Sequence, residues 1–145
     1  MYVKPQWIKV VFASHAIFSS MAVIANADAN DLGRRVGDFI GWNAAADVFK
    51  TSRCRDAIRD GNPGYLKRDH FSEAVDLIRR RYKDNQEVQG FMSHEAQLER
   101  MRNQLTRQSA ERLAVTLGQS PSPQMCGFIN AEIDNQIYLT QSRLP

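Results

Sequence analysis

Two histidines and the carboxylates beside them are the residues whose types and spacing could do chemistry. His70 precedes Glu73 by three positions, and His94 is followed directly by Glu95. If these segments were antiparallel neighbouring helices, the two imidazoles and two carboxylates could converge on a zinc, copper or di-iron site. The order is His-x-x-Glu, however, whereas carboxylate di-iron bundles use Glu-x-x-His. We therefore expect no metal and no other cofactor, and we keep a metal site built from these four residues as an alternative.

Carboxylates four residues apart could also act as a general acid and base. Asp69 with Glu73, and Glu95 with Glu99, have this spacing, which places both groups of a pair on one face of a helix. Such pairs are common on solvated helix faces, so the pattern is not specific. The sequence contains no G-x-S-x-G, H-E-x-x-H, P-loop or haem-attachment motif. These observations argue against an enzyme.

Cys54 and Cys126 are the only cysteines in the chain. They form no C-x-x-C pair and neither has a histidine close by in sequence, which argues against a catalytic thiol or a metal pair. A disulfide between them would close a long loop and stabilise the fold by roughly 4 kcal/mol in the chain-entropy model. In an oxidising compartment, an even pair of cysteines is expected to form a disulfide, so the sequence predicts a bond between Cys54 and Cys126 if the chain is exported.

The N-terminal segment has the organisation of an export signal. Two lysines precede the apolar stretch of residues 10–24, and Ala25-Asn26-Ala27 places small residues as signal peptidase requires for cleavage before Asp28. An uncleaved anchor is the alternative, but serines and a histidine dilute the apolar stretch, and no second apolar run follows. The sequence thus predicts a signal peptide over residues 1–27, one domain over 28–145, a periplasmic or secreted location and no stable membrane insertion after cleavage. The absence of N-x-S/T sites after the signal agrees with a bacterial origin.

The net charge argues against nucleic acid as a partner. The full chain has 19 basic and 16 acidic residues, and two of the basic residues are the lysines of the predicted signal. The remaining domain is nearly neutral, whereas nucleic-acid and anionic-lipid binding require a clustered basic excess.

Apolar residues recur at helical rather than strand spacing through most of the domain. This spacing predicts helices over residues 31–49, 66–83, 86–117 and 122–137, with a short helical turn and a loop at 51–65. No strand hairpin is predicted. We therefore expect an all-α fold, a small bundle-like domain of four to five helices that the disulfide pins near one end.

The first predicted helix contains a regular stripe of small residues, namely Gly33, Gly37, Gly41 and Ala45. Each glycine inside a helix costs about 1 kcal/mol relative to alanine, so three in register require a reason. Close approach of a second helix is one such reason. Charged residues interrupt the segment and argue against a dimer within a membrane. We expect close helix packing inside the domain, with a homodimer as an alternative.

These features predict a non-catalytic exported protein that recognises another exported protein. A domain held rigid by a disulfide loses little ordering entropy when it binds. Aromatic and methionine side chains are the candidate anchors where they are exposed, since such residues are enriched in interface cores. The candidates are Trp42, Tyr65, Met92, Met125 and Tyr138, with burial in the core as the alternative for Trp42 and Met92. An immunity-type inhibitor of a toxic enzyme is the specific form that this architecture suggests by analogy.

Two other functions remain open from the sequence. A periplasmic chaperone or stress protein could use the glycine stripe and the arginine-bearing helices to form a dynamic dimer that holds unfolded clients. Such a protein would expose a large apolar patch and bind many chains weakly. A metal-binding helical protein would instead use His70 and His94.

Overall fold

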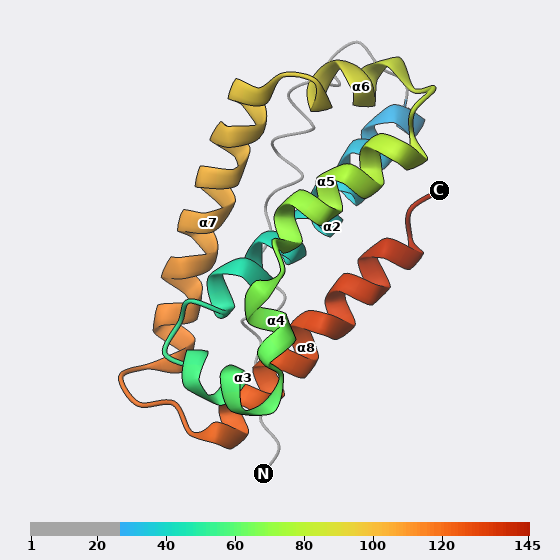
Figure 1. The fold of residues 1–145 in the computed structure, drawn as a ribbon. Helices are drawn as coiled ribbons and strands as arrows, with labels where there is room; N and C mark the ends of the chain where they lie inside the picture. The colour runs from blue at the N-terminus through green and yellow to red at the C-terminus, as the bar shows by residue number, and fades with distance from the viewer. Residues whose placement is uncertain (1–26) are drawn as a thin grey trace.

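The structure is a computed structural model that describes residues 27–145. In that range the chain forms seven helices and no strand (Figure 1). They are α2 (Ala27–Phe49), α3 (Arg55–Gly61), α4 (Pro63–Lys67), α5 (His70–Arg81), α6 (Gln86–Met92), α7 (Glu95–Leu117) and α8 (Pro123–Ser142). The predicted all-α fold is confirmed. The predicted signal peptide lies, apart from its last residue, outside the described residues.

The prediction of four or five helices was wrong, because two segments form more helices than their apolar spacing indicates. Residues 51–65, predicted as a helical turn and a loop, contain α3 and the start of α4. Residues 86–117, predicted as one helix, are divided around His94 into α6 and α7. His94 has an extended backbone (φ −91°, ψ 94°), and Arg79 Nε of α5 donates at 3.2 Å to the carbonyl of Met92, the last residue of α6. The carbonyl at the end of α6 therefore receives its hydrogen bond from a side chain of another helix. The apolar periodicity of residues 86–117 contains no sign of this contact.

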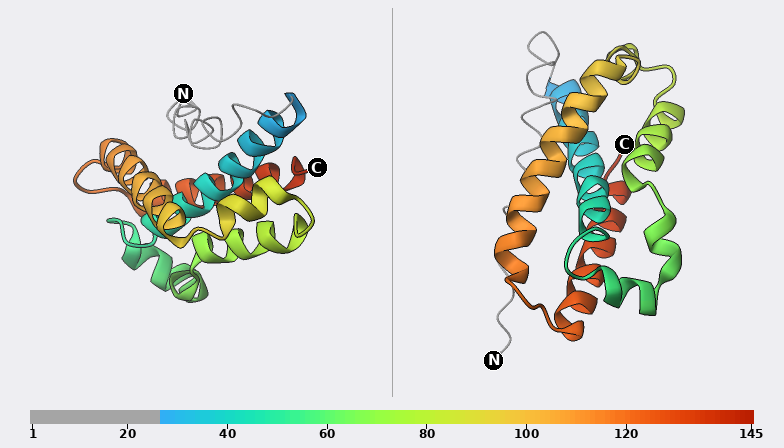
Figure 2. Two further views of the ribbon diagram at one scale, coloured as in Figure 1. Left: turned by 90° about the horizontal axis from the view of Figure 1, so that it is seen from above. Right: turned by 60° about the vertical axis from the view of Figure 1, so that its left-hand side comes forward.

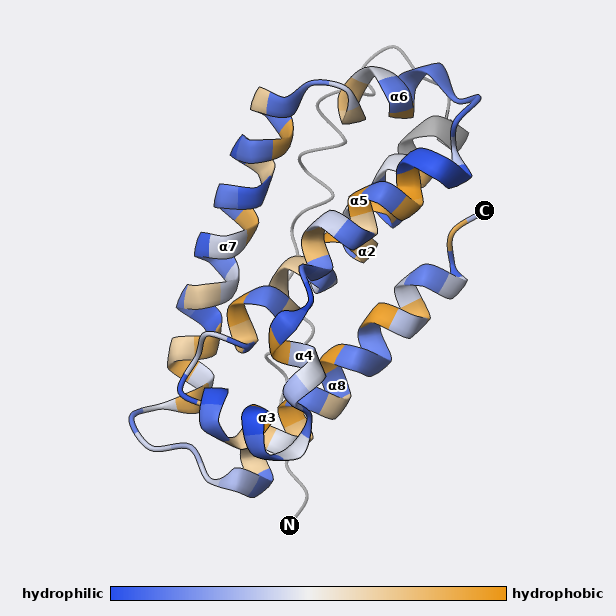
Figure 3. Cartoon of the chain, in the orientation of Figure 1, coloured by the Kyte–Doolittle hydropathy of each residue, from blue (hydrophilic) through white to orange (hydrophobic). Residues whose placement is uncertain are grey.

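Helix α2 is the centre of the domain. It contacts α5, α7 and α8, and Figure 2 shows these helices arranged around it. Between Val36 and Phe49 every residue of α2 is buried except Asp38 and Asp47, which are half-buried. Helix α7 is amphipathic instead, and Figure 3 shows its outer edge to be largely hydrophilic. The surrounding helices therefore bury α2 on most of its circumference, as expected for a helix that is apolar on nearly all sides. None of the helices in the described part of the chain combines the length and apolar character needed to span a membrane.

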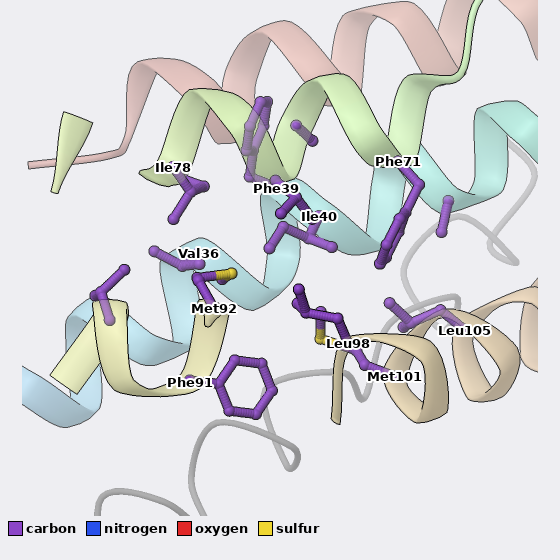
Figure 4. Close-up of a cluster of buried hydrophobic side chains, with 14 of the residues drawn as sticks. Val36, Phe39, Ile40, Phe71, Ile78, Phe91, Met92, Leu98, Met101 and Leu105 are labelled. Atoms are coloured by element: carbon purple, nitrogen blue, oxygen red, sulfur yellow. The ribbon is translucent and has the colours of Figure 1, made fainter. Parts of the chain in front are cut away.

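The apolar core has two clusters along α2. The first joins α2 to α5, α6 and the first half of α7 (Figure 4). Its labelled members in Figure 4 are Val36, Phe39, Ile40, Phe71, Ile78, Phe91, Met92, Leu98, Met101 and Leu105. The second surrounds the disulfide and joins the C-terminal half of α2 to α3, α4, the end of α7 and α8. Helices α2 and α7 therefore each contribute to both clusters.

The predicted disulfide between Cys54 and Cys126 is present. It links the residue before α3 to the first turns of α8, and the two Cα atoms are 5.5 Å apart. Both half-cystines are buried in the second core cluster. The bond ties the segment after α2 to the last helix, as predicted, and disulfides of this kind are typical of oxidising compartments outside the cytoplasm.

The residues after α8 are fastened to the rest of the domain. Arg35 Nη1 donates at 2.7 Å to the carbonyl of Arg143, and Arg81 Nη2 donates at 3.0 Å to the carbonyl of Leu144. The Tyr82 hydroxyl lies 2.9 Å from the carbonyl oxygen of Pro145, and Leu144 packs into the first core cluster. The tail therefore holds the end of α8 against α2 and α5.

Candidate functional site

The Asp47 carboxylate of α2 caps the start of α5. Its Oδ1 accepts the backbone N–H of His70, and its Oδ2 accepts that of Phe71, both at 2.9 Å. The His70 ring nitrogen Nδ1 lies 3.1 Å from the same Oδ1, and Lys50 Nζ lies 3.2 Å from it. Burial would raise the pKa of Asp47, but these donors outweigh burial and lower its pKa to about 2. The carboxylate therefore stays ionised at neutral pH and holds α2 against α5.

A group of polar side chains extends from this cap towards α8; Tyr65 and His70 are buried, and the members on α8 are half-buried or exposed. The rings of Tyr65 and His70 are 4.6 Å apart, centroid to centroid. Burial raises the pKa of Tyr65, and Asp134 and Asp47 act on it in the same direction. A side-chain hydrogen bond with Asn130 lowers the pKa of this hydroxyl and partly offsets these effects. Asp134 lies near enough to His70 for the two to interact electrostatically. We call Asp47, Tyr65, His70, Asn130 and Asp134 the polar junction, because they come from α2, α4, α5 and α8.

The polar junction is not built as a catalytic site. The side chain of His70 is only 2% exposed, and Tyr65 is 4% exposed. A substrate arriving from solvent therefore cannot reach the imidazole within hydrogen-bond distance, as general acid–base catalysis requires. The arrangement instead brings polar side chains together where four helices meet, with Asp47 bonded to the start of α5.

The structure does not bring together the four residues of the alternative metal site. His70 faces Asp47, whereas His94 is exposed and its Nδ1 contacts the carbonyl of Gly90. Glu73 accepts a hydrogen bond from Arg68 Nε at 3.1 Å. Within residues 27–145 no three His, Cys, Asp or Glu side chains gather as a metal ion would require.

The first of the two carboxylate pairs consists of ion-paired groups at the start of α5. Asp69 accepts the backbone N–H of Ser72 at 3.1 Å and lies 3.2 Å from Arg102 Nη2. Its pKa is lowered, because these interactions outweigh the effect of burial, and the hydrogen bond from Arg68 lowers the pKa of Glu73. A general acid needs a raised pKa, so this pair is not tuned for that role.

The second pair, Glu95 and Glu99, lies on the α7 wall of a groove between α5 and α7. The groove has a volume of about 520 Å³, and Phe71, Val75 and Leu98 contribute its apolar lining. Charged side chains of both signs, among them Arg79 and Arg102, also line it. Both glutamates are exposed to solvent, so this pair has the surroundings of a solvated helix face.

The outward side of α8 exposes large apolar side chains. Met125 is 40% exposed, Phe128 is 37% exposed and Tyr138 is 70% exposed. Ala131 is also exposed between them. From Pro123 to Ser142 the helix contains no lysine or arginine, and its two charged residues are acidic. We call Met125, Phe128, Ala131 and Tyr138 the α8 outer face.

The structure divides the predicted binding anchors between core and surface. Trp42, Tyr65 and Met92 are buried, at 5%, 4% and 0% exposure, whereas Met125 and Tyr138 lie on the α8 outer face. Phe128 was missing from the prediction. A signal for it was available, because Phe128 stands outside the helical spacing of Cys126, Ile129, Ile133 and Ile137 that marks the buried side of α8.

The small-residue stripe lies along α2. Gly37, Gly41 and Ala45 are buried, and Gly33 is half-buried. Ala45 belongs to the second core cluster, with residues of α7 and α8. The expectation that the three glycines allow a second helix to approach closely stays a prediction.

Comparison with protein-family models, with curated proteins and with solved structures found no match. The geometry of the described residues therefore has to support the functional proposal alone.

Proposed function

We propose that this chain is an exported, non-catalytic protein that binds another exported protein through the α8 outer face. The observation that carries the proposal is the exposure of Met125, Phe128 and Tyr138 on one helix without a basic side chain among them. Interface cores are enriched in aromatic residues and methionine and are depleted of lysine. The α8 outer face has this composition.

The disulfide supports both the location and the mode of binding. Cys126 anchors the first turns of α8 to Cys54, and Ile129 and Ile133 are almost fully buried against the rest of the core. The backbone that presents Phe128 and Tyr138 is therefore ordered before binding, which lowers the entropic cost of association. The bond also suits a periplasmic or secreted protein, since disulfides persist in oxidising compartments.

The specific form that we propose is an immunity-type inhibitor of a toxic exported enzyme. It should bind one folded target tightly and in fixed stoichiometry. A periplasmic chaperone would instead bind many unfolded chains weakly. These two behaviours give the test its two arms.

The test begins with affinity capture of the tagged domain, from Asp28 onwards, from the exported fraction of its source. The captured partner is purified, and its affinity is measured by titration calorimetry for the wild type, Phe128→Ala and Tyr138→Ala. Truncation of an interface anchor typically costs more than about 1.4 kcal/mol, so we expect each variant to bind at least about tenfold more weakly. Val115→Ala is the matched control, because Val115 is 85% exposed on α7 and its truncation should leave affinity unchanged.

The proposal fails if a stoichiometric partner binds both α8 variants as tightly as the wild type. A broad set of unfolded clients would favour the chaperone instead. Circular dichroism of each variant confirms that the fold is retained, which separates loss of the binding surface from loss of structure.

A further inference from the structure

Two carboxylates lie beside the aromatic side chains of the α8 outer face. Glu132 is four residues after Phe128, and Asp134 is four residues before Tyr138. Residues four apart are neighbours on a helix surface, so each ring has one carboxylate next to it. Glu132 is half-buried and Asp134 is exposed. The face therefore combines apolar anchors with negative charge.

This negative charge has no basic side chain close enough to form an ion pair in the described part of the chain. The ion pairs within residues 27–145 include neither Glu132 nor Asp134. From residue 113 to residue 142 the sequence contains no lysine, arginine or histidine. The pKa of Asp134 is raised, because burial outweighs the attraction of the more distant His70 and Arg68. The two carboxylates thus leave the face with a negative potential that the domain itself does not neutralise.

The order of these residues disfavours a second copy of this chain as the occupant of the face. Phe128 and Tyr138 lie five residues to either side of Ile133, and the two carboxylates lie one residue to either side of it. If two antiparallel copies of α8 paired about a two-fold axis at the level of Ile133, their aromatic residues would come level with one another. The same register would bring all four carboxylates to the centre of the interface, where like charges oppose association. A partner with a different sequence avoids this conflict.

We propose that the α8 outer face recognises a basic protein surface, whose arginine or lysine side chains pair with Glu132 and Asp134 between the contacts of Phe128 and Tyr138. This inference rests on the binding function proposed above and specifies the chemistry of the partner. Arginine suits the site best, because its planar guanidinium pairs with a carboxylate and also stacks on an aromatic ring. Opposite charges on the two proteins also accelerate their association at low ionic strength.

The test measures association rate constants by stopped-flow mixing with the partner purified by the affinity capture described above. The variant is the double substitution Glu132→Gln and Asp134→Asn. Glutamine at position 132 keeps an oxygen that can accept the hydrogen bond from Gln136 Nε2, and circular dichroism checks that the fold is retained. The matched control is Glu99→Gln with Glu111→Gln, which removes the same net charge from exposed positions on α7.

We expect the α8 double variant to associate at least about tenfold more slowly than the wild type at an ionic strength of about 0.01 M. The difference should disappear at about 1 M, where the Debye length falls to about 3 Å. The control should associate nearly as fast as the wild type at both ionic strengths. This pattern would show that the two carboxylates of α8, and not the net charge of the domain, attract the partner.

Equal association rates for the wild type and the α8 double variant at low ionic strength would overturn the inference. If Phe128→Ala still weakened binding of that partner, the binding function would stand and only the basic partner would be wrong. If neither change had an effect, or if the capture retained no partner, both proposals would fail. Sedimentation velocity of the domain alone adds a test that needs no partner. Self-association that Phe128→Ala abolishes would make a second copy the occupant and would also overturn the inference.

Discussion

The cap formed by Asp47 should make the stability of this domain depend on pH in a defined window. Its pKa is about 2 in the folded protein, against an ordinary value of 3.8. A difference of nearly two pKa units, at about 1.36 kcal/mol each, corresponds to roughly 2 kcal/mol of stability from the ionised group. The side chain is only 16% exposed, so solvent screening reduces this figure little.

The sign of the effect follows from the lowered pKa. The ionised carboxylate contributes its full stabilisation above pH 3.8, the value expected in the unfolded chain. The contribution is lost as the pH falls through the folded value of about 2. Asp47→Asn removes the charge but keeps the size of the side chain and one acceptor oxygen. We therefore expect this variant to be about 2 kcal/mol less stable than the wild type at pH 7, and the difference to shrink towards pH 2.

Urea denaturation at several pH values between 2 and 7 measures this difference directly. Asp56→Asn is the control, because the Asp56 side chain is 80% exposed and its ion pair with Arg59 lies at the surface, where such pairs contribute little. The reasoning is refuted if Asp47→Asn costs less than about 0.5 kcal/mol at pH 7, or if its difference from the wild type is the same at pH 7 and pH 2.

Two further predictions concern the disulfide and the glycines. Replacing both Cys54 and Cys126 with alanine removes a link between residues 72 positions apart in the sequence. This double substitution should lower the free energy of unfolding by about 4 kcal/mol in the chain-entropy model. A loss below about 1 kcal/mol in urea denaturation would contradict this expectation. Gly118→Ala should cost about 1–3 kcal/mol, because Gly118 ends α7 with φ +62°, a conformation that other residues adopt only with strain. Gly127→Ala should instead stabilise α8 by up to about 1 kcal/mol, because an added Cβ there meets open space; thermal denaturation of the two variants should therefore shift in opposite directions.

Much of the fold could be predicted from local patterns in the sequence. The helical spacing of apolar residues predicted an all-α domain and a last helix beginning at residue 122. In the structure Ser122 is the N-cap of α8, with its side chain accepting the backbone N–H of Met125. The pairing of Cys54 with Cys126 followed because the chain contains no other cysteine and because neither has the sequence neighbours of a metal or catalytic site. The helices could be predicted because they depend on residues that lie close together in the sequence. The disulfide could be predicted because the chain contains only two cysteines.

The division of residues 86–117 into two helices could not be predicted in the same way. The pattern of apolar residues continues across His94, and the Arg79 side chain that satisfies the end of α6 comes from α5. The burial of Trp42, Tyr65 and Met92 also depends on contacts with other helices. Their types suit both an interface and a core, and only the packing around them decides which.

The candidate site shows the same division between sequence and structure. The sequence by itself determined the helical class of the domain and the disulfide. The helical spacing also places Phe128 and Tyr138 away from the buried side of α8 that Cys126, Ile129 and Ile133 mark. Only the tertiary structure decided that Asp47 caps α5 and that His70 is buried beside Tyr65 instead of meeting His94. Hydrogen bonds and burial between distant helices depend on how those helices pack, and helical periodicity does not determine which faces meet.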